Sequence, residues 1–402
     1  MKILITTMIL GGFVGDSGQM WHIANGLIKK GHQVDVLTSD GNAWFYDKEK
    51  AKKYDETVRK KILNTDGKKV IINGVNTFAV HCISESCGMY SPNLKKIANK
   101  IIKNYDLVYA IHWYDYITME MSKIAINNNI PFVVAAYGSL QESARNINKK
   151  WLKKICDVVY TKNIIKNASA FHSVGDLETE EYVKIGVKSE KIFRIDHGVI
   201  LSDYKIEKRS NIIEKLGIKL EKDKYIIFVG KLNEKKGIDY LLKAFSQLKE
   251  IQNLFLIIVG NGEEKYVKKL IKLQGILNLK EKVKFTGLVS HNEKLELLES
   301  AAIFVTTSHS DVHSIAAQEA LLMGVPVIIS KDSDWPEIQE YNAGILIDIN
   351  LDSITNAIMQ LITNNEELKK CSQNAKRLVN EKFLMKHIID QYETEFLKVI
   401  KE

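Results

Sequence analysis

Residues 306–330, TTSHSDVHSIAAQEALLMGVPVIIS, join the end of one apolar run to the start of the next. A small polar loop follows Thr306, and the pattern predicts a helix from near Ser314 to about Met323. Gly324 is placed to end that helix, and Val325-Pro326-Val327 opens a new β-rich run. The stretch therefore predicts a strand, a loop, a helix and a second strand, which is the repeating unit of a parallel α/β sheet.

The same alternation extends over the C-terminal half of the chain. A helix is expected from about Ile238 to Leu248, and the segment from about Glu366 on is expected to be helical throughout. The strands predicted in this half are Tyr225–Val229, Leu254–Val259, Val283–Thr286, Ile303–Thr306, Val325–Ile329 and Gly344–Ile347.

The N-terminal half shows the same pattern. A helix is expected from about Gln19 to Lys30, ended by Gly31. The strands predicted here are Lys2–Thr7, Gln33–Thr38, Asn76–Val80, Asp106–Ile111, Pro131–Ala136 and Ala170–Val174. Periodicity lapses near 202–210, so the sequence predicts two Rossmann-like α/β domains, residues 1–205 and 206–380. Ligands of such sheets bind beyond the carboxyl ends of the strands.

Composition excludes several classes of protein. The 402 residues are 45% hydrophobic and 26% charged with 4 Pro, which excludes a disordered, collagen-like or disulfide-stapled chain. No apolar run approaches the roughly 20 residues of a membrane span, and no export signal is evident, so a cytoplasmic protein is expected. The 4 Cys, at 82, 87, 156 and 371, are expected to be reduced, and His81 beside Cys82 lacks the further ligands of a metal site.

The positive charge is concentrated in the first half. Residues 1–205 hold 29 Lys and Arg against 21 Asp and Glu, a net of 29 − 21 = +8, while the rest is neutral. Residues 148–166, NKKWLKKICDVVYTKNIIK, form its most basic stretch. Two interpretations stay open: an amphipathic helix packed on its own domain with a solvated lysine face, or a surface that meets anionic lipid at the inner face of a membrane.

The loop and helix of 306–330 have the chemistry of a phosphate site. The N–H groups of Ser314, Ile315 and Ala316 would lie at a helix N-terminus, which favours anions. Glu319 could then bond a ribose hydroxyl and Asp311 a sugar beyond the phosphate, although each alone could equally be a solvated side chain. Neither G-x-G-x-x-G with a following acidic residue nor G-x-x-x-x-G-K-[ST] occurs, which weakens dinucleotide oxidoreductases and P-loop enzymes as candidates.

Asp311, Glu319-Ala320 and Gly324-Val325-Pro326-Val327 together resemble the signature of the GT-B glycosyltransferases of the family 4 type. Gly230-Lys231 with Lys236-Gly237 resembles that family's phosphate loop. Further segments that resemble parts of that family are Gly260-Asn261-Gly262, Phe285–Val289, which includes Leu288, Gly15–Gly18 and Ile195–Val199. The match covers nearly the whole chain. Lys231 stands where Arg is common, Tyr137 where a His often precedes Gly-Ser, and Asp311 where Glu is usual.

The resemblance implies a fold, a reaction and residue roles. It implies a GT-B fold whose last helix, residues 381–402, crosses back to the first domain, and a retaining glycosyltransferase. It places His112, Lys231, Lys236 and Asp311 in catalysis. It places Gly15, Gly18, Gly230, Leu288, Val289, Ser314, Ile315, Ala316 and Glu319 at the donor. His112 also stands at a predicted strand end, where many histidines are merely packed.

The leaving diphosphate needs a counter-charge. No well-placed Asp-x-Asp motif for a divalent ion is found, so Lys231, Lys236 and the helix N-terminus are expected to supply it without a metal or other cofactor. The expected donor is a UDP- or GDP-sugar, and the acceptor a sugar, glycolipid or glycan; no nucleic acid is expected. Open alternatives are another GT-B enzyme, such as a sugar-nucleotide epimerase or a sugar phosphorylase, and a non-catalytic binding protein.

Overall fold

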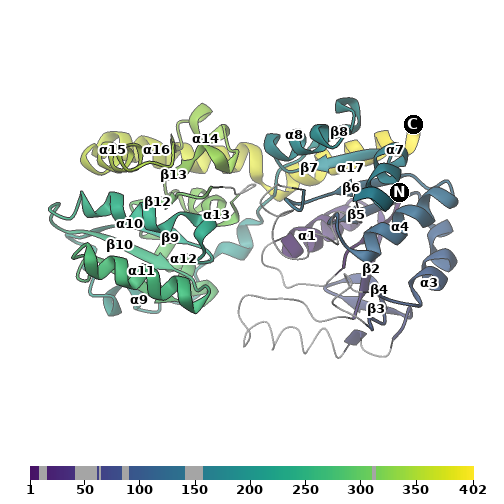
Figure 1. The fold of residues 1–402 in the computed structure, drawn as a ribbon, viewed down its shortest axis with the longest axis horizontal. Helices are drawn as coiled ribbons and strands as arrows, with labels where there is room; N and C mark the ends of the chain where they lie inside the picture. The colour runs from purple at the N-terminus through teal and green to yellow at the C-terminus, as the bar shows by residue number, and fades with distance from the viewer. Residues whose placement is uncertain (9–15, 41–60, 63–64, 84–89, 141–156, 310–313) are drawn as a thin grey trace. The chain divides into compact units, whose positions relative to one another are not determined.

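The computed structural model describes residues 1–8, 16–40, 61–62, 65–83, 90–140, 157–309 and 314–402. By their contacts these residues form two compact units. Unit 1 comprises Met1–Gly198 and Met385–Glu402, and unit 2 comprises Val199–Leu384. Each unit is an α/β domain of its own (Figure 1). The chain leaves the first unit at Gly198, whereas the apolar periodicity of the sequence lapses near 202–210.

Unit 1 is built on an eight-stranded sheet of order β3-β4-β2-β1-β5-β6-β7-β8. All neighbours are parallel except β3 and β4. The strands are β1 (Lys2–Thr6), β2 (Gln33–Ser39), β3 (Lys69–Ile72), β4 (Val75–Val80), β5 (Leu107–Ile111), β6 (Phe132–Ala135), β7 (Ala170–Ser173) and β8 (Ile192–Arg194). The helices include α1 (Asp16–Lys29), α3 (Leu94–Ile101), α4 (Tyr116–Asn127), α7 (Lys162–Asn167) and α8 (Asp176–Lys184).

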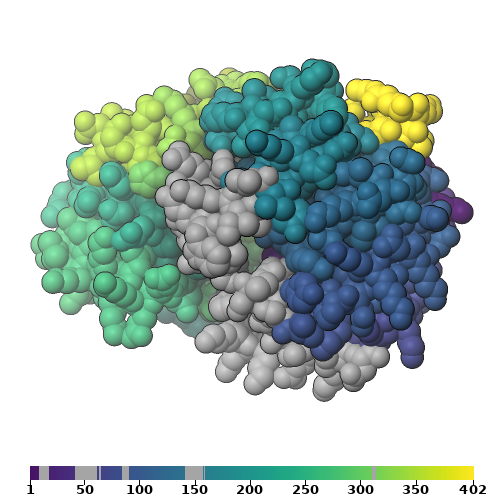
Figure 2. Space-filling model, turned by 45° about the vertical axis from the view of Figure 1, so that its right-hand side comes forward, coloured from purple at the N-terminus to yellow at the C-terminus, as the bar shows by residue number. Residues whose placement is uncertain are grey.

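The last helix of the chain, α17 (Met385–Lys401), belongs to this N-terminal unit. Tyr392 and Phe396 are 1% and 0% exposed, and their rings lie 5.9 and 5.3 Å from that of Tyr109 on β5. Lys30, just after α1, bridges to Asp390 at 2.7 Å. Figure 1 shows α17 in yellow against the unit, and Figure 2 shows its exposed C-terminal end at the surface.

Unit 2 is built on a six-stranded parallel sheet of order β11-β10-β9-β12-β13-β14. Its strands are β9 (Lys224–Val229), β10 (Leu254–Val259), β11 (Val283–Gly287), β12 (Ile303–Thr306), β13 (Val327–Ser330) and β14 (Gly344–Ile347). Its helices are α9 (Ile212–Lys215), α10 (Ile238–Ser246), α11 (Glu264–Ile276), α12 (His291–Glu299), α13 (Ile315–Met323), α14 (Glu337–Glu340), α15 (Leu351–Thr363) and α16 (Asn365–Leu378). Apolar clusters fill both faces of the sheet.

The expectation that the segment from about Glu366 is helical throughout is wrong at Leu384. The helix α16 ends in a π-turn, η7 (Val379–Phe383), and Leu384 is extended. Leu384 pairs with Val199 in an isolated parallel bridge, and the Val199 N–H donates to the Phe383 carbonyl at 2.8 Å. The first and last residues of unit 2 are thus paired side by side, and the helical direction restarts only at Met385 in unit 1.

Candidate functional site

In unit 2 a short lysine-bearing loop follows β9. Lys231 is exposed and lies directly after Gly230. The loop then forms a 3-10 turn, η5 (Glu234–Lys236), whose first residue follows Asn233; the Asn233 side chain accepts from the Lys236 N–H at 3.2 Å. The turn ends at Gly237, whose φ of +59° is the left-handed conformation that favours glycine.

This loop is fixed against the residues that follow β12. The Thr307 hydroxyl donates to the carbonyls of Lys236 and Gly237 at 3.1 and 2.8 Å, and the His309 N–H donates to the Lys235 carbonyl at 2.8 Å. A Cβ on Gly237 would lie 2.2 Å from the Thr307 carbonyl oxygen, so only glycine allows this approach. The lysine loop is therefore held beside the segment that leads into α13.

The helix α13 presents its N-terminus directly after that segment. Ser314 is its N-cap and accepts from the Ala317 N–H at 3.4 Å. Ile315 and Ala316 form the first turn and are half-buried. Because first-turn N–H groups have no acceptor within their own helix and lie at the positive end of the helix dipole, this turn is suited to an anion.

The neighbouring strand ends are locked to the same edge of the sheet. The Gly260 N–H after β10 donates to the Gly287 carbonyl of β11 at 2.9 Å. A Cβ on Gly260 would lie 1.9 Å from the Gly230 carbonyl oxygen. Beyond Gly287, Leu288 leaves 48% of its surface exposed and Val289 is half-buried. Two apolar residues thus follow β11, which is separated from β9 and its lysine loop by β10.

Glu319 is not a solvated helix residue, which was one of its expected roles. It is 3% exposed, and its Oε1 lies 2.6 Å from the Lys294 ammonium of α12. A carboxylate this buried is costly unless it is paired, and Lys294 provides that pairing. The sequence did not indicate Lys294, because its partner stands 25 positions further along the chain. The Ser290–Glu293 capping box could have located only the start of its helix.

In unit 1, His112 and Tyr137 follow neighbouring strands, β5 and β6. Both have left-handed backbones, with φ of +76° and +46°, although neither is glycine. Their ring centroids lie 6.4 Å apart. Such backbone costs energy and is retained where the surroundings determine it, and it gathers at functional sites. The pair is therefore the best candidate site that the described part of this unit offers.

The turn that carries Tyr137 is held by α8. The buried Glu178 carboxylate accepts from the Gly138 N–H at 2.6 Å and from the Val174 N–H at 3.0 Å. The Tyr182 hydroxyl accepts from the Ala136 N–H at 2.7 Å. One helix therefore fixes the loops after both β6 and β7, and Glu178 is a residue that the sequence did not single out.

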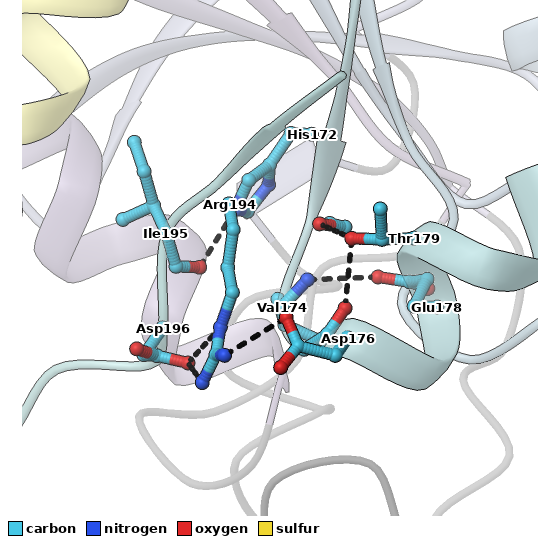
Figure 3. Close-up of polar contacts among 10 residues, drawn as sticks. His172, Val174, Asp176, Glu178, Thr179, Arg194, Ile195 and Asp196 are labelled. Carbon is cyan, nitrogen blue, oxygen red and sulfur yellow. Dashed lines mark hydrogen bonds and ion pairs between the residues drawn. The ribbon is translucent and has the colours of Figure 1, made fainter. Parts of the chain in front are cut away.

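A buried hydrogen-bonded chain lies beneath Tyr137. Its hydroxyl lies 3.1 Å from that of Tyr109, which lies 2.8 Å from His172 Nδ1. His172 Nε2 lies 2.8 Å from the Ile195 carbonyl, which is an acceptor (Figure 3). Nε2 is therefore the protonated nitrogen, and Nδ1 accepts from Tyr109. Burial lowers the pKa of His172 from 6.5 to about 4, so the ring is neutral near pH 7.

Asp115, close after His112, is committed to its own helix. It is the N-cap of α4 and accepts from the Thr118 N–H at 2.7 Å. Burial raises its pKa to about 6, opposed by the hydrogen bonds from Thr118 and Ile117. A capping carboxyl that nearly lacks solvent contact is a structural residue.

Some predicted site residues lie outside the described residues or in a helix. Gly15, Asp311, His313, Cys87, Cys156 and positions 148–156 are not described. Gly18 is buried within α1. His81 lies 2.9 Å from the Asp40 carboxylate, which raises the His81 pKa. Over the described ranges, no group of three or more His, Cys, Asp and Glu is arranged to hold a metal ion. None of the helices in those ranges is both long and apolar enough to cross a bilayer.

Two family models match the chain. The model described as "Glycosyltransferase Family 4" matches residues 18–203, and "Glycosyl transferases group 1" matches residues 208–378. Together they span nearly the whole sequence, and each falls mainly on one of the two units.

Curated relatives and solved structures agree with the models. An uncharacterized glycosyltransferase of Methanocaldococcus jannaschii is 25% identical over 375 residues, covering 90% of this chain and 88% of its own. An N-acetyl-alpha-D-glucosaminyl L-malate synthase of Bacillus anthracis is 25% identical over 228 residues, covering 56% and 58%. The Anabaena protein HepE, solved in complex with UDP, superposes with a TM-score of 0.76 at 18% identity, covering 99% of this chain and 100% of its own.

Proposed function

Because this chain belongs to the GT-B glycosyltransferases of the family 4 type, we propose that it is a retaining enzyme that needs no metal. It transfers a sugar from a nucleoside-diphosphate sugar to a sugar, glycolipid or glycan acceptor.

The donor assignment rests on one observation: the lysine loop is hydrogen-bonded to the segment between β12 and α13. Thr307 binds the loop through two carbonyls, and the loop carries Lys236 at its end. Lys231, Lys236 and the first turn of α13 therefore supply two cationic groups and a helix N-terminus from one edge of the sheet. A diphosphate is the ligand part that this combination suits.

The remaining donor roles are those that the resemblance to the family implies. Glu319 on α13 binds ribose hydroxyls, while Leu288 and Val289 contact the base and Gly230 lets the backbone approach the phosphates. Gly15 and Gly18 line the first domain's side of the donor. Asp311 binds the sugar, and His112, at the end of β5 in unit 1, contacts the transferred sugar.

The chemistry needs stabilisation of a leaving group. When the bond between the anomeric carbon and the diphosphate breaks, negative charge grows on the β-phosphate oxygen. Lys231, Lys236 and the α13 dipole stabilise that charge as preorganised groups. The departing phosphate oxygen takes the proton of the acceptor hydroxyl, which attacks on the same face, so the anomeric configuration is kept.

Two relatives suggest which donors to test first. HepE has been solved with UDP and glucose, and the Bacillus anthracis relative is by its name a glucosaminyl-transferring synthase. UDP-glucose and UDP-N-acetylglucosamine are therefore the first donors, followed by the GDP-sugars.

The acceptor side of the proposal concerns the basic first half. In the described part of the basic stretch, Ile164 of α7 is buried while Lys162 and Lys166 are exposed, as expected for a helix packed on its own domain. The exposed lysines and Val159, 55% exposed, form a surface that we propose meets anionic lipid when the acceptor is a glycolipid.

The deciding experiment is a thermal-shift screen with UDP-, GDP- and ADP-sugars against the free nucleotides. Selective stabilisation by one sugar nucleotide supports a donor site. Turnover of that donor with EDTA present, followed by NMR of the anomeric proton of the product, tests metal independence and retention. Release of a free epimer would assign an epimerase, a need for inorganic phosphate would assign a phosphorylase, and binding without turnover would assign a binding protein.

A further inference from the structure

The carboxylate assigned to the ribose is held by a second residue from another helix. Lys294 of α12 reaches Glu319 Oε1 at 2.6 Å, and the side chains are 16% and 5% exposed. Within the described part of the chain, Oε2 of Glu319 takes no hydrogen bond. One carboxylate oxygen is therefore fixed by the protein, and the other is left for a ligand.

A second element, η4 (Leu201–Tyr204), also lies near Glu319. Tyr204, at the end of η4 (Leu201–Tyr204), has its pKa raised by burial and further by the negative charge of Glu319. The Tyr204 ring lies 6.0 Å from that of His291, the first residue of α12. Residues of η4 and of α12 thus lie near the carboxylate, and Lys294 of α12 brings it a positive charge.

We propose that Lys294 is a positioning residue of the donor site, which fixes Glu319 through Oε1 so that Oε2 faces the ribose hydroxyls. The proposal rests on the proposed function, because it takes Glu319 as the ribose ligand. Without Lys294, the buried carboxylate would be free to rotate or take up a proton, and the ribose would meet a disordered or neutral acceptor.

The test compares Lys294→Met with the wild type in the full chain, using calorimetric affinities for two ligands. The first ligand is UDP or GDP, whichever binds, and the second is its 2′,3′-dideoxy form. We expect Lys294→Met to weaken binding of the ribonucleotide about tenfold, the value of one charge-assisted hydrogen bond. Affinity for the dideoxy form should change less than about twofold.

Four further variants complete the test. Lys294→Arg keeps the charge and should restore most of the ribonucleotide affinity. Glu319→Gln should mimic Lys294→Met, and the double variant should be no weaker than either single variant, since both remove one interaction. Lys268→Met, which removes an exposed partner of Glu264 on α11, is the matched control and should bind both ligands normally.

Each outcome has a distinct meaning. Equal losses for the ribonucleotide and its dideoxy form would overturn the proposal, because a lysine that only attracts the diphosphate or supports the fold weakens both. Equal wild-type affinity for the ribonucleotide and its dideoxy form would also overturn the proposal, because it would show that Glu319 does not bind the ribose hydroxyls. Failure of the wild type to bind any nucleoside diphosphate or its sugars would instead refute the proposed function.

Discussion

Replacing His172 with Gln should change how the stability of unit 1 depends on pH. In the folded chain, burial lowers the His172 pKa from 6.5 to about 4, while the unfolded chain keeps the ordinary value. Between these two values the unfolded state binds a proton that the folded state does not. The contribution of this histidine is therefore present above pH 6.5 and is lost as the pH falls toward 4.

The expected size follows from the two pKa values. A shift of one pKa unit corresponds to about 1.4 kcal/mol, and between about pH 7.5 and about pH 5 the linkage amounts to about 2 kcal/mol. Acidification over that range should thus destabilise the wild type by about 2 kcal/mol more than His172→Gln. The exposed His309, replaced by Gln, is the control for the loss of a surface histidine.

Asp115 supplies an opposite slope in the same unit. Burial raises its pKa from 3.8 to about 6, so its ionised form costs stability above pH 6, and that cost falls as the pH is lowered toward 4. Asp115→Asn keeps the N-cap. On acidification over the same pH range, this variant should lose about 1 kcal/mol more stability than the wild type loses.

The assay is urea denaturation of each variant across this pH range, followed by circular dichroism and tryptophan fluorescence. NMR of the 10 histidines gives an independent check, because the resonance assigned by its loss in His172→Gln should not titrate above about pH 5. A His172 resonance that titrates near pH 6.5, or equal pH slopes in variant and wild type, would refute the buried neutral ring.

Other changes test the donor site, the last helix and the basic surface. Lys236→Ala should lower turnover about 10²- to 10³-fold with an unchanged melting temperature, whereas Lys268→Ala should leave both turnover and melting temperature unchanged. Wild-type turnover in Lys236→Ala would remove Lys236 from the chemistry. Gly237→Ala should cost about 1–3 kcal/mol of stability in urea denaturation and weaken nucleotide binding, because its Cβ would meet the Thr307 carbonyl; normal binding would contradict the need for glycine. Phe396→Ala should destabilise unit 1 by about 3–5 kcal/mol in the same assay, and a loss below about 1 kcal/mol would show that α17 is dispensable there. The full chain should sediment with anionic but not neutral vesicles, and only at low salt; no sedimentation would assign the lysines of 148–166 to a solvated face.

Strands buried on both faces were the most predictable part of the fold. Leu254–Val259 and Ile303–Thr306, which lie inside the six-stranded sheet, have the bounds that their apolar runs predict. These runs end where a glycine or polar residue begins a loop, which is the pattern of central parallel strands. The edge strands β3 and β8 were missed, since they are short and partly exposed, with Ile71 of β3 67% exposed.

Features of the site that depend on neighbouring residues in the sequence were predictable, whereas contacts between separate elements were not. The glycines at 237, 260 and 324 mark turns whose φ values are positive in the structure. In contrast, the expected uninterrupted helix beyond Glu366 failed at Leu384, because pairing with Val199 across the unit overrides a helical pattern. The partnership of Lys294 with Glu319 likewise depends on how α12 packs on α13, which residue spacing within one helix does not reveal.

Each unit has a residue with a left-handed backbone in a segment that follows a strand, and the residue type differs between the two units. In unit 2 the left-handed position after β9 is Gly237, which adopts it without steric cost, and a hydroxyl from the next strand end fixes it. In unit 1 the equivalent device after β6 uses Tyr137, with the Glu178 carboxylate fixing the adjacent Gly138 N–H. A bulky residue in that conformation costs on the order of 1–2 kcal/mol, which glycine would avoid. The Tyr137 side chain therefore contributes something that the turn alone does not need: it places a hydroxyl on the buried Tyr109–His172 chain and its ring beside His112.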